Sequence, residues 1–383
     1  MAVAGGVASL ILANGFIDWN LRFGRESTIH SQLGHIRVFK QGYLESGLAN
    51  PFRYAMADDP KKIAIIESDP RVRALAPRLS VNGLISHGDA TLSFLGEGVA
   101  PDKETLLSKS VTITEGEALA SSDPQGIVLG QGLAANLGVK PGDTVVLLAN
   151  TRNGGVNAVE ARVRGLFATI TKAYDDSALR LPIAMARQLS RIKGSHSYAL
   201  VLDDTDNTSA VLAELRERFR GEPLELVPWF ELADFYNKTA ELFTRQVAVL
   251  RAIVAIIIVL AISNSMMMSV LERTSEIGTS MALGTRRGAI LRLFVTEGAL
   301  LGLFGGVLGL AGGYVLAQLI SAVGIPMPPP PGMAFGYTAG IAVSWQPALE
   351  ACALAVATAL IASLYPAWRA SRMTIVDALR HNR

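Results

Sequence analysis

The stretch "LERTSEIGTSMALGTRRGAILRLF", Leu271–Phe294, is a polar segment between two long apolar runs. The runs on either side are Val247–Val270 and Ile290–Ile320, and a third run, Ala348–Pro366, follows later in the chain. Each reaches the roughly 20 mostly apolar residues that a helix needs to cross a bilayer. The sequence therefore predicts a membrane protein in which the polar stretch lies at a membrane surface.

The N-terminus supplies a fourth candidate span. "MAVAGGVASLILANGFI" is apolar or small apart from Ser9 and Asn14, and no Lys or Arg precedes it. A signal peptide carries a basic region before its apolar core, so we favour a transmembrane helix over a cleaved signal. Asp18, Trp19 and Arg22 then mark its far interface. We also expect a short basic segment to precede this helix in the natural protein.

The arginines of the short loops predict the orientation. The loop Ser321–Pro347 contains no charged residue, whereas the loop Leu271–Ala289 and the tail after Pro366 are basic. Their arginines are Arg273, Arg286 and Arg287 in the loop and Arg369, Arg372, Arg380 and Arg383 in the tail. Loops rich in Lys and Arg stay in the cytoplasm. The segment between the first and second helices is then extracytoplasmic.

Composition excludes several classes of function. Half of the 383 residues are apolar, while the net charge of +2 and the absence of basic blocks interleaved with aromatics exclude nucleic acid as a partner. The lone Cys352 cannot form an intrachain disulfide, and the five histidines lack the HxxxH or HExxH spacing of metal sites. We therefore expect no metal ligands, no bound cofactor and no catalytic residues.

Residues 24–242 predict an α+β domain. "HIRVF", "TLSFL", "DTVVLLA" and "VEARVRGLFA" are typical of strands, and "DPKKIAIIESDP" and "DNTSAVLAELRERF" of helices. Lys140–Asp143 predicts a turn, and so do the adjacent acids Asp175 and Asp176. The segment contains no GxGxxG, GxSxG or kinase signature, which disfavours a membrane-anchored enzyme.

A helix is also predicted just before the second span. In "PWFELADFYNKTAELFTRQVAVLR" the apolar residues recur every three or four positions, at Phe230, Ala233, Tyr236, Ala240 and Phe243. Such a helix would continue into the membrane and act as a rigid lever. The alternative is a helix that only packs on the domain.

The opening stretch itself has helical features. Glu272 and Glu276 are four residues apart, Ile277, Met281 and Leu283 lie near one side, and Gly278 and Gly284 are expected to break or bend the helix. From the residues alone, docking onto a cytoplasmic partner and a loop anchored by arginines are both open.

This stretch resembles the Glu-Arg-Thr-x-Glu-Ile-Gly…Ala-Leu-Gly-Ala segment of the ABC-transporter permeases related to MacB, LolC, LolE and FtsX. The matching positions are Glu272, Arg273, Thr274, Glu276, Ile277, Gly278, Ala282, Leu283, Gly284, Ile290, Phe294 and Glu297. The C-terminal "YPAWRASRMTIVDALR" is similar to the ending of the same family, and "LGHIRVF" and "LANLGVKPGD" are closest to the LolC and LolE branch.

The resemblance implies four transmembrane helices, with a large α+β periplasmic domain inserted between helices 1 and 2. It also implies two permease chains paired with two ATPase subunits. The residues implied to couple to the ATPase are Glu272, Arg273, Glu276, Ile277, Gly278, Ala282, Leu283, Gly284, Arg286 and Arg287. ATP and Mg are then bound by the partner, because a Walker A motif needs a Gly-Lys step and the chain has no Gly-Lys dipeptide.

Two glycine strips on the third span predict close helix packing. They are Gly298, Gly302 and Gly306, and Gly305, Gly309 and Gly313. A second permease chain or a helix of the same chain could pack there, and we favour the second chain. Nearby, Glu297 has either an arginine partner or a mechanistic role.

Together these features predict an inner-membrane permease subunit that transmits ATP-driven movement to its periplasmic domain and extracts or exports a lipoprotein, lipid or amphipathic substrate. The alternative is an FtsX-like relay that activates a periplasmic cell-wall hydrolase. The expected segments are helix 1 at 1–23, the domain and stalk at 24–242, helix 2 at 243–270, the coupling loop at 271–289, helix 3 at 290–320, a short periplasmic loop at 321–347, helix 4 at 348–366 and a cytoplasmic tail at 367–383.

Overall fold

The computed structural model describes residues 1–47, 50–169, 171–328 and 336–374. The chain forms two compact units. The membrane unit comprises Met1–Arg22, Thr239–Pro326 and Thr338–Arg383, and the domain unit comprises Phe23–Lys238 and Met327–Tyr337. Part of the proline-rich loop, and Arg380 and Arg383 of the predicted tail, lie outside the described residues.

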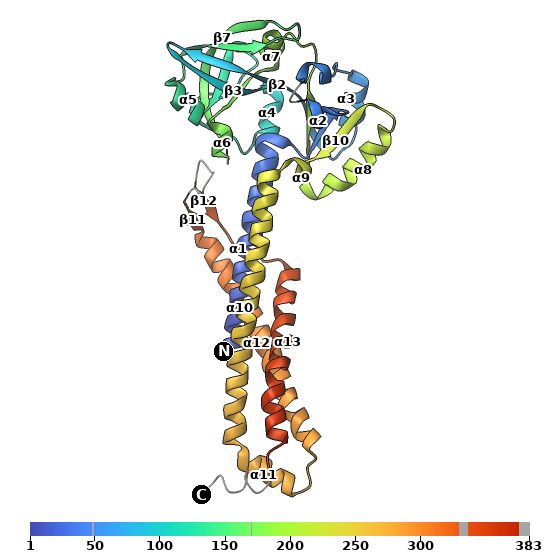
Figure 1. The fold of residues 1–383 in the computed structure, drawn as a ribbon, viewed down its shortest axis with the longest axis vertical. Helices are drawn as coiled ribbons and strands as arrows, with labels where there is room; N and C mark the ends of the chain where they lie inside the picture. Colours follow the sequence, from blue (N-terminus) through green and yellow to red (C-terminus); the bar gives the residue numbers. More distant parts are fainter. Residues whose placement is uncertain (48–49, 170, 329–335, 375–383) are drawn as a thin grey trace. The chain divides into compact units, whose positions relative to one another are not determined.

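Four long helices are apolar enough to cross a membrane (Figure 1). They are α1 (Ala2–Thr28), α10 (Asp234–Glu272), α12 (Arg287–Val323) and α13 (Trp345–Ser371). Each contains one of the apolar runs recognised in the sequence. Two short strands, β11 (Ile325–Met327) and β12 (Tyr337–Ala339), pair with each other between α12 and α13.

Both glycine strips of α12 pack against helices of the same chain. A Cβ added at Gly302 would lie 2.7 Å from the Cβ of Ala359 in α13, and one at Gly309 would lie 2.7 Å from the Cβ of Val7 in α1. Gly298 and Gly306 likewise face α13, and Gly305 and Gly313 face α1. Contrary to our preference for a second permease chain, the glycines let α1 and α13 approach α12 within one chain.

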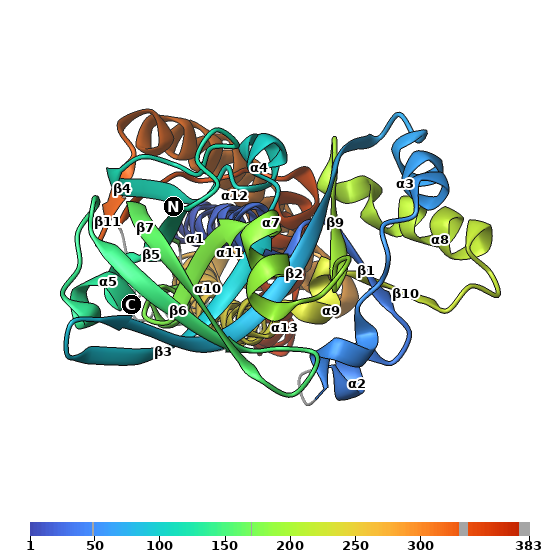
Figure 2. The same ribbon diagram turned by 90° about the horizontal axis from the view of Figure 1, so that it is seen from above.

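The smaller lobe of the domain unit is a four-stranded sheet with two helices. Its elements follow the chain as β1 (Ile36–Lys40), α3 (Pro60–Glu67), β2 (Val72–His87), β9 (Ser197–Leu202), α8 (Thr208–Arg218) and β10 (Leu224–Pro228). The strand order β10-β1-β9-β2 with antiparallel neighbours is that of the ferredoxin-like βαββαβ motif. Figure 2 shows α3 and α8 side by side on the outer side of this lobe, and the core between helices and sheet includes Leu75, Leu200 and Leu215.

The larger lobe is a closed barrel inserted between β2 and β9. The second half of β2 pairs with β3 and β6, and the remaining pairs β3–β8, β8–β5, β5–β7 and β7–β6 complete a ring. The new strands are β3 (Ala90–Val99), β5 (Gly126–Gly130), β6 (Thr144–Asn150), β7 (Val156–Ala168) and β8 (Ala178–Pro182), and β4 (Thr112–Gly116) extends β7. Closure leaves the six strands of the ring without a free edge, and the barrel interior is filled by residues such as Phe94, Ile127 and Leu147.

Short helices cover the two lobes and join their strands. The barrel carries α4 (Pro101–Leu107), α5 (Gln131–Leu137), α6 (Lys172–Asp175) and α7 (Ile183–Ser190). Five further turns are η1 (Ile29–Leu33), α2 (Tyr43–Ser46), η2 (Pro51–Tyr54), η3 (Thr205–Asn207) and α9 (Trp229–Leu232). The domain contains both helices and strands, which confirms the α+β prediction.

Local signals in the sequence account for several of these elements. Asp59 caps α3 by accepting from the backbone N of Lys61, and Asp143 closes its turn by accepting from the backbone N of Lys140. The acids Asp175 and Asp176 do not form a simple turn. They end the one-turn helix α6, where buried Asp175 accepts hydrogen bonds from Thr169.

The helix predicted before the second span starts later than expected. Phe230 lies in α9 and Ala233 in the break that follows it, and α10 then runs unbroken from Asp234 to Glu272. The continuous helix agrees with the lever rather than with a helix confined to the domain.

Candidate functional site

The polar stretch that opened the sequence analysis folds into a nine-residue helix, α11 (Thr274–Ala282), at one end of the four-helix bundle (Figure 1). It is separated from α10 by Arg273, which leaves the helical conformation with φ −98° and ψ 16°. The N of Thr285 donates to the carbonyl oxygen of Ser280, and the N of Gly284 to that of Met281. With Gly284 at φ +101°, this is a Schellman motif, which terminates the helix.

One face of α11 anchors it to the bundle. Thr274, Ile277, Gly278 and Met281 are buried, and Ile277 and Met281 belong to an apolar cluster that includes residues of α1, α10, α12 and α13. The Thr274 hydroxyl donates to the Val270 carbonyl oxygen one turn back. These contacts fix how α11 is presented at the end of the spans.

The exposed residues of α11 and of the turns on either side of it include charges without ion pairs. Among the described residues, no ion pair is formed by any of the five charged coupling candidates, which are exposed: Glu272, Arg273, Glu276, Arg286 and Arg287. Ala282 and Gly284 are exposed as well, and Leu283 is 85% exposed. Leu283 is thus a large exposed apolar side chain with exposed charged residues before and after it in the chain.

Two details of the predicted stretch were wrong. Gly278 does not break the helix but lies on its buried face, where absence of a side chain suits close packing. Leu283 does not share a side with Ile277 and Met281, because the helix ends before it and the chain turns outward. Of the predicted coupling residues, Ile277 and Gly278 therefore hold the helix in place, while the others form its surface.

Ionisable side chains also occur within the spans. Arg251 of α10 pairs with Glu350 of α13, with Nη2 and Oε2 3.3 Å apart, a partner that the sequence analysis did not identify. Arg22 and Asp18 of α1 form a 2.9 Å pair that shares Ser344, the residue preceding α13. Glu297 is half-buried and has no ion pair within the described residues, so no arginine partner is found for it.

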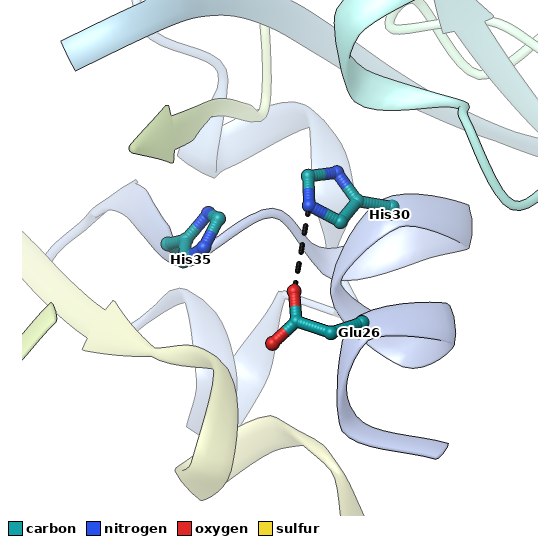
Figure 3. A group of neighbouring side chains, drawn as sticks. All are labelled: Glu26, His30 and His35. Atoms are coloured by element: carbon teal, nitrogen blue, oxygen red, sulfur yellow. Dashed lines mark ion pairs between the residues drawn. The ribbon is translucent and has the colours of Figure 1, made fainter. Parts of the chain in front are cut away.

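In the domain unit, Glu26, His30 and His35 lie together at the end of α1 and the start of β1 (Figure 3). The Nε2 of His30 is 3.7 Å from Oε2 of Glu26, and Nδ1 of His30 is buried without a hydrogen bond to any described residue. The sequence analysis missed this group, although Glu26 and His30 have the i,i+4 spacing that places side chains on one helix face.

The hydrogen bonds of His35 do not fit a metal ligand. Its Nδ1 accepts from the backbone N of Leu202, so the proton is on Nε2, which donates to the Thr205 hydroxyl 3.0 Å away. That hydroxyl donates in turn to Glu26. A metal-bound histidine instead donates through its other ring nitrogen. These hydrogen bonds connect the end of α1 to η3. Burial, together with the positive charges of His30 and Arg25, lowers the pKa of His35 to about 4.

A buried charge network joins the two lobes of the domain. Arg37 Nη2 lies 2.9 Å from Glu97, and Arg78 Nη1 lies 2.7 Å from Glu104. Arg180 is 3.5 Å from Glu104, donates to Ser108 and the Ser31 carbonyl oxygen, and lies over the ring of Phe167. Burial opposes ionisation of Glu97, yet Arg78 and Arg37 lower its pKa to about 2. Nothing in the sequence indicates this network, because its members are far apart in the chain and lie on β1, β2, β3, β8 and α4.

Comparison with known proteins agrees with this architecture. Residues 248–375 match the FtsX-like permease C-terminal domain, and residues 1–218 match the MacB-like periplasmic core domain. The lipoprotein-releasing system transmembrane protein LolC of Xylella fastidiosa is 28% identical over 349 residues, which cover 85% of this chain and 82% of LolC.

Two further relatives extend the comparison. An uncharacterised ABC transporter permease of Methanocaldococcus jannaschii is 28% identical over 287 residues, covering 73% of this chain and 68% of the relative. The macrolide export ATP-binding/permease protein MacB of Chromobacterium violaceum is 26% identical over 404 residues, covering 99% of this chain but 56% of MacB. The four apolar helices, the α+β domain and these matches together show that the chain is a multi-pass membrane protein of the FtsX-like ABC transporter permease family, with a MacB-like periplasmic core domain.

Proposed function

We propose that this permease works by mechanotransmission. ATP hydrolysis by a separate ATPase subunit, which binds the ATP and Mg, moves α11, and the helices carry the movement to the periplasmic domain. A second permease chain completes the complex in the inner membrane. The moving domains extract or export a lipoprotein, lipid or other amphipathic substrate.

The exposed face of α11 is the observation that carries this proposal. Exposed charges on both sides of an exposed leucine can be matched by complementary charges of a partner, while the leucine loses its contact with water. The buried side of the same helix belongs to the apolar cluster that also contains residues of all four spans, so force applied to α11 can pass to the spans through that cluster. A loop held only by arginines at the lipid surface would not need that apolar anchor.

The shape of α10 supports the transmission step. It is one helix of 39 residues without an internal break, and a straight α-helix of that length spans about 58 Å. Movement at its inner end therefore displaces its outer end, because the backbone hydrogen bonds resist bending. Asp234, where it begins, follows directly on the last elements of the domain.

The substrate class rests on the relatives. LolC is named for a lipoprotein-releasing system and MacB for macrolide export, so amphipathic cargo is common to both. The chain matches LolC over most of the length of both proteins, and lipoprotein is therefore our first choice of substrate.

Affinity purification of the full chain from its native membrane, in mild detergent, tests the proposal. We expect an ATPase and a lipoprotein or lipid among the co-purifying molecules by mass spectrometry. Recovery of a cell-wall hydrolase with no lipidic cargo would favour a signalling relay, and recovery of no ATPase would contradict the role of α11.

Coupling is measured on the same complex in proteoliposomes. Glu276→Lys should uncouple ATP hydrolysis from cargo release, since it reverses a charge on the exposed face of α11. The matched control is Glu160→Lys, which reverses an exposed charge on barrel strand β7. Equal coupling in both variants would contradict the proposal.

A further inference from the structure

A lateral groove opens among three helices of the membrane unit. It has a volume of about 540 Å³ and is lined by residues of α1, α10 and α13. Most of the lining side chains are small: Ala252 and Ala255 come from α10, and Ala351, Ala353 and Ala357 from α13. Small side chains at this position leave the space between α10 and α13 unfilled by the chain itself.

The same groove contains an ion pair. Arg251 and Glu350 both line it, on opposite helices, with their charged atoms 3.3 Å apart and their side chains 38% and 47% exposed. The second carboxylate oxygen of Glu350 accepts from Gln346 at 3.3 Å. Both residues lie near one end of their apolar runs, Val247–Val270 and Ala348–Pro366, so the pair is expected at the depth of the lipid headgroups. The groove thus combines an apolar channel with one cation and one anion.

The geometry points to a lipid as the occupant. We propose that the groove binds an acyl chain of a phosphatidylethanolamine-type lipid, with the headgroup at the ion pair. The guanidinium of Arg251 is suited to the headgroup phosphate, and the carboxylate of Glu350 is suited to the ammonium. The alanine walls allow close dispersion contact with the chain.

The volume argues against a helix of a second permease chain as the occupant. A helix about 10 Å across, rising 1.5 Å per residue, fills roughly 120 Å³ per residue. The groove would then hold only roughly five residues of helix, little more than one turn. A single acyl chain has no side chains to accommodate and needs only a narrow channel.

The role of the groove rests on the proposed function. In that role, the groove is the place where the lipid chain of the cargo leaves the bilayer. Binding itself is testable without the ATPase. Failure of ATP-driven release with lipid still bound in the groove would contradict the proposed function alone. Normal release with an empty groove would contradict only the site.

The experiment uses the full chain in nanodiscs that contain phosphatidylethanolamine with a photoreactive acyl chain. After irradiation, mass spectrometry of peptides should place the label on α10 near Ala255 and on α13 near Ala357. Ala255→Phe and Ala357→Phe fill the groove, and each should lower this labelling roughly tenfold, equal to about 1.4 kcal/mol of binding. The matched control is Ala311→Phe, an exposed alanine of α12 that does not line the groove, and it should keep the label.

The ion pair is tested in the same assay. Arg251→Gln should lower labelling by phosphatidylethanolamine and raise the fraction removed by a detergent wash. Uniform labelling of all four helices, or labelling unchanged by Ala255→Phe and Ala357→Phe, would overturn the proposal. A cross-link from this groove to a second permease chain would also overturn it and would assign the groove to the subunit interface.

Discussion

The surface of α11 and the interior of the periplasmic domain use the same residue types in opposite ways. Around α11, arginines and glutamates are exposed and unpaired among the described residues. In the domain, Arg78 and Arg180 are almost fully buried, with 3% and 4% of their side chains exposed, and both lie against Glu104. Unpaired exposed charges cost little and remain available to a partner, whereas buried charges are tolerated only when paired. The difference separates residues proposed to contact a partner from residues that hold the fold.

The largest effect is expected from breaking the buried network. Glu104→Ala would leave Arg78 and Arg180 buried without their shared carboxylate and should destabilise the domain by about 3–5 kcal/mol. Thermal unfolding of the full chain in detergent, followed by tryptophan fluorescence, measures the loss. The control Glu160→Ala removes an exposed glutamate of β7 and should change stability by less than about 0.5 kcal/mol.

The second prediction extends the comparison to pH. The pKa of His35 is lowered to about 4 from its ordinary 6.5, so the folded state favours the neutral ring. The contribution of His35 to the free energy of unfolding is complete above pH 6.5. This contribution, on the order of 3 kcal/mol, is lost as the pH falls toward 4.

Unfolding midpoints across this pH window check the prediction. His35→Asn should flatten the dependence, and His87→Asn, at the end of β2 on the surface of the barrel, should keep it. A His35→Asn variant with the same pH dependence as the wild type would contradict the assignment.

The third prediction concerns a substitution that should weaken binding of the ATPase without changing the stability of the permease. Leu283→Asp places a charge where the apolar side chain is 85% exposed, so stability should change by less than about 0.5 kcal/mol. If Leu283 is a hot spot, the affinity for the ATPase should fall by about 2 kcal/mol or more, which is roughly thirtyfold.

Titration of the solubilised permease with the purified ATPase measures this affinity. Leu84→Asp, at an exposed leucine of the barrel, should bind the ATPase as the wild type does. If Leu283→Asp unfolds the protein, or binds the ATPase normally, the α11 surface and the domain interior do not differ in the way stated above.

The smallest effect is expected at the end of α11. Gly284 has φ +101° and no neighbouring atom within 4 Å of an added Cβ, so Gly284→Ala tests backbone strain alone and should cost about 1 kcal/mol. Gly288→Ala is the matched control, since Gly288 also has free space but lies in the first turn of α12. It should be neutral or slightly stabilising. Equal unfolding midpoints for the two variants would show that the turn is not strained.

Local patterns predicted most of the helices and strands. The four apolar runs, the cap at Asp59 and the turn at Asp143 depend on residues that are near each other in the chain, where spacing carries the information. The glycine strips of α12 correctly indicated close helix packing, but a strip has the same spacing whether its neighbour belongs to the same chain or to another. The prediction that Gly278 breaks the helix was wrong, because a glycine on a buried helix face and a glycine that breaks a helix look alike in sequence.

The parts of the structure that could not be predicted depend on long-range contacts. Arg37 and Glu97 are 60 residues apart and Glu104 and Arg180 are 76 apart. They meet only because β1, β9, β2, β3 and β8 follow one another in the sheet and α4 packs beside β2. Arg251 and Glu350 meet because α10 and α13 are neighbours, which hydropathy does not reveal. The coupling residues were predicted from a resemblance to a family, and their coupling role stays a prediction, while the division of this stretch into buried and exposed residues needed the structure.

The position of the barrel between β2 and β9 has a consequence for how the domain folds. Arg78 of β2 pairs with Ser197 of β9, and all the barrel strands lie between them in the chain. Closing so long a loop is entropically unfavourable until the barrel has formed and brought its two ends together. We therefore expect the ferredoxin-like lobe to be completed last and to open first, with amide hydrogens of β1 and β10 exchanging before those of β3 and β5.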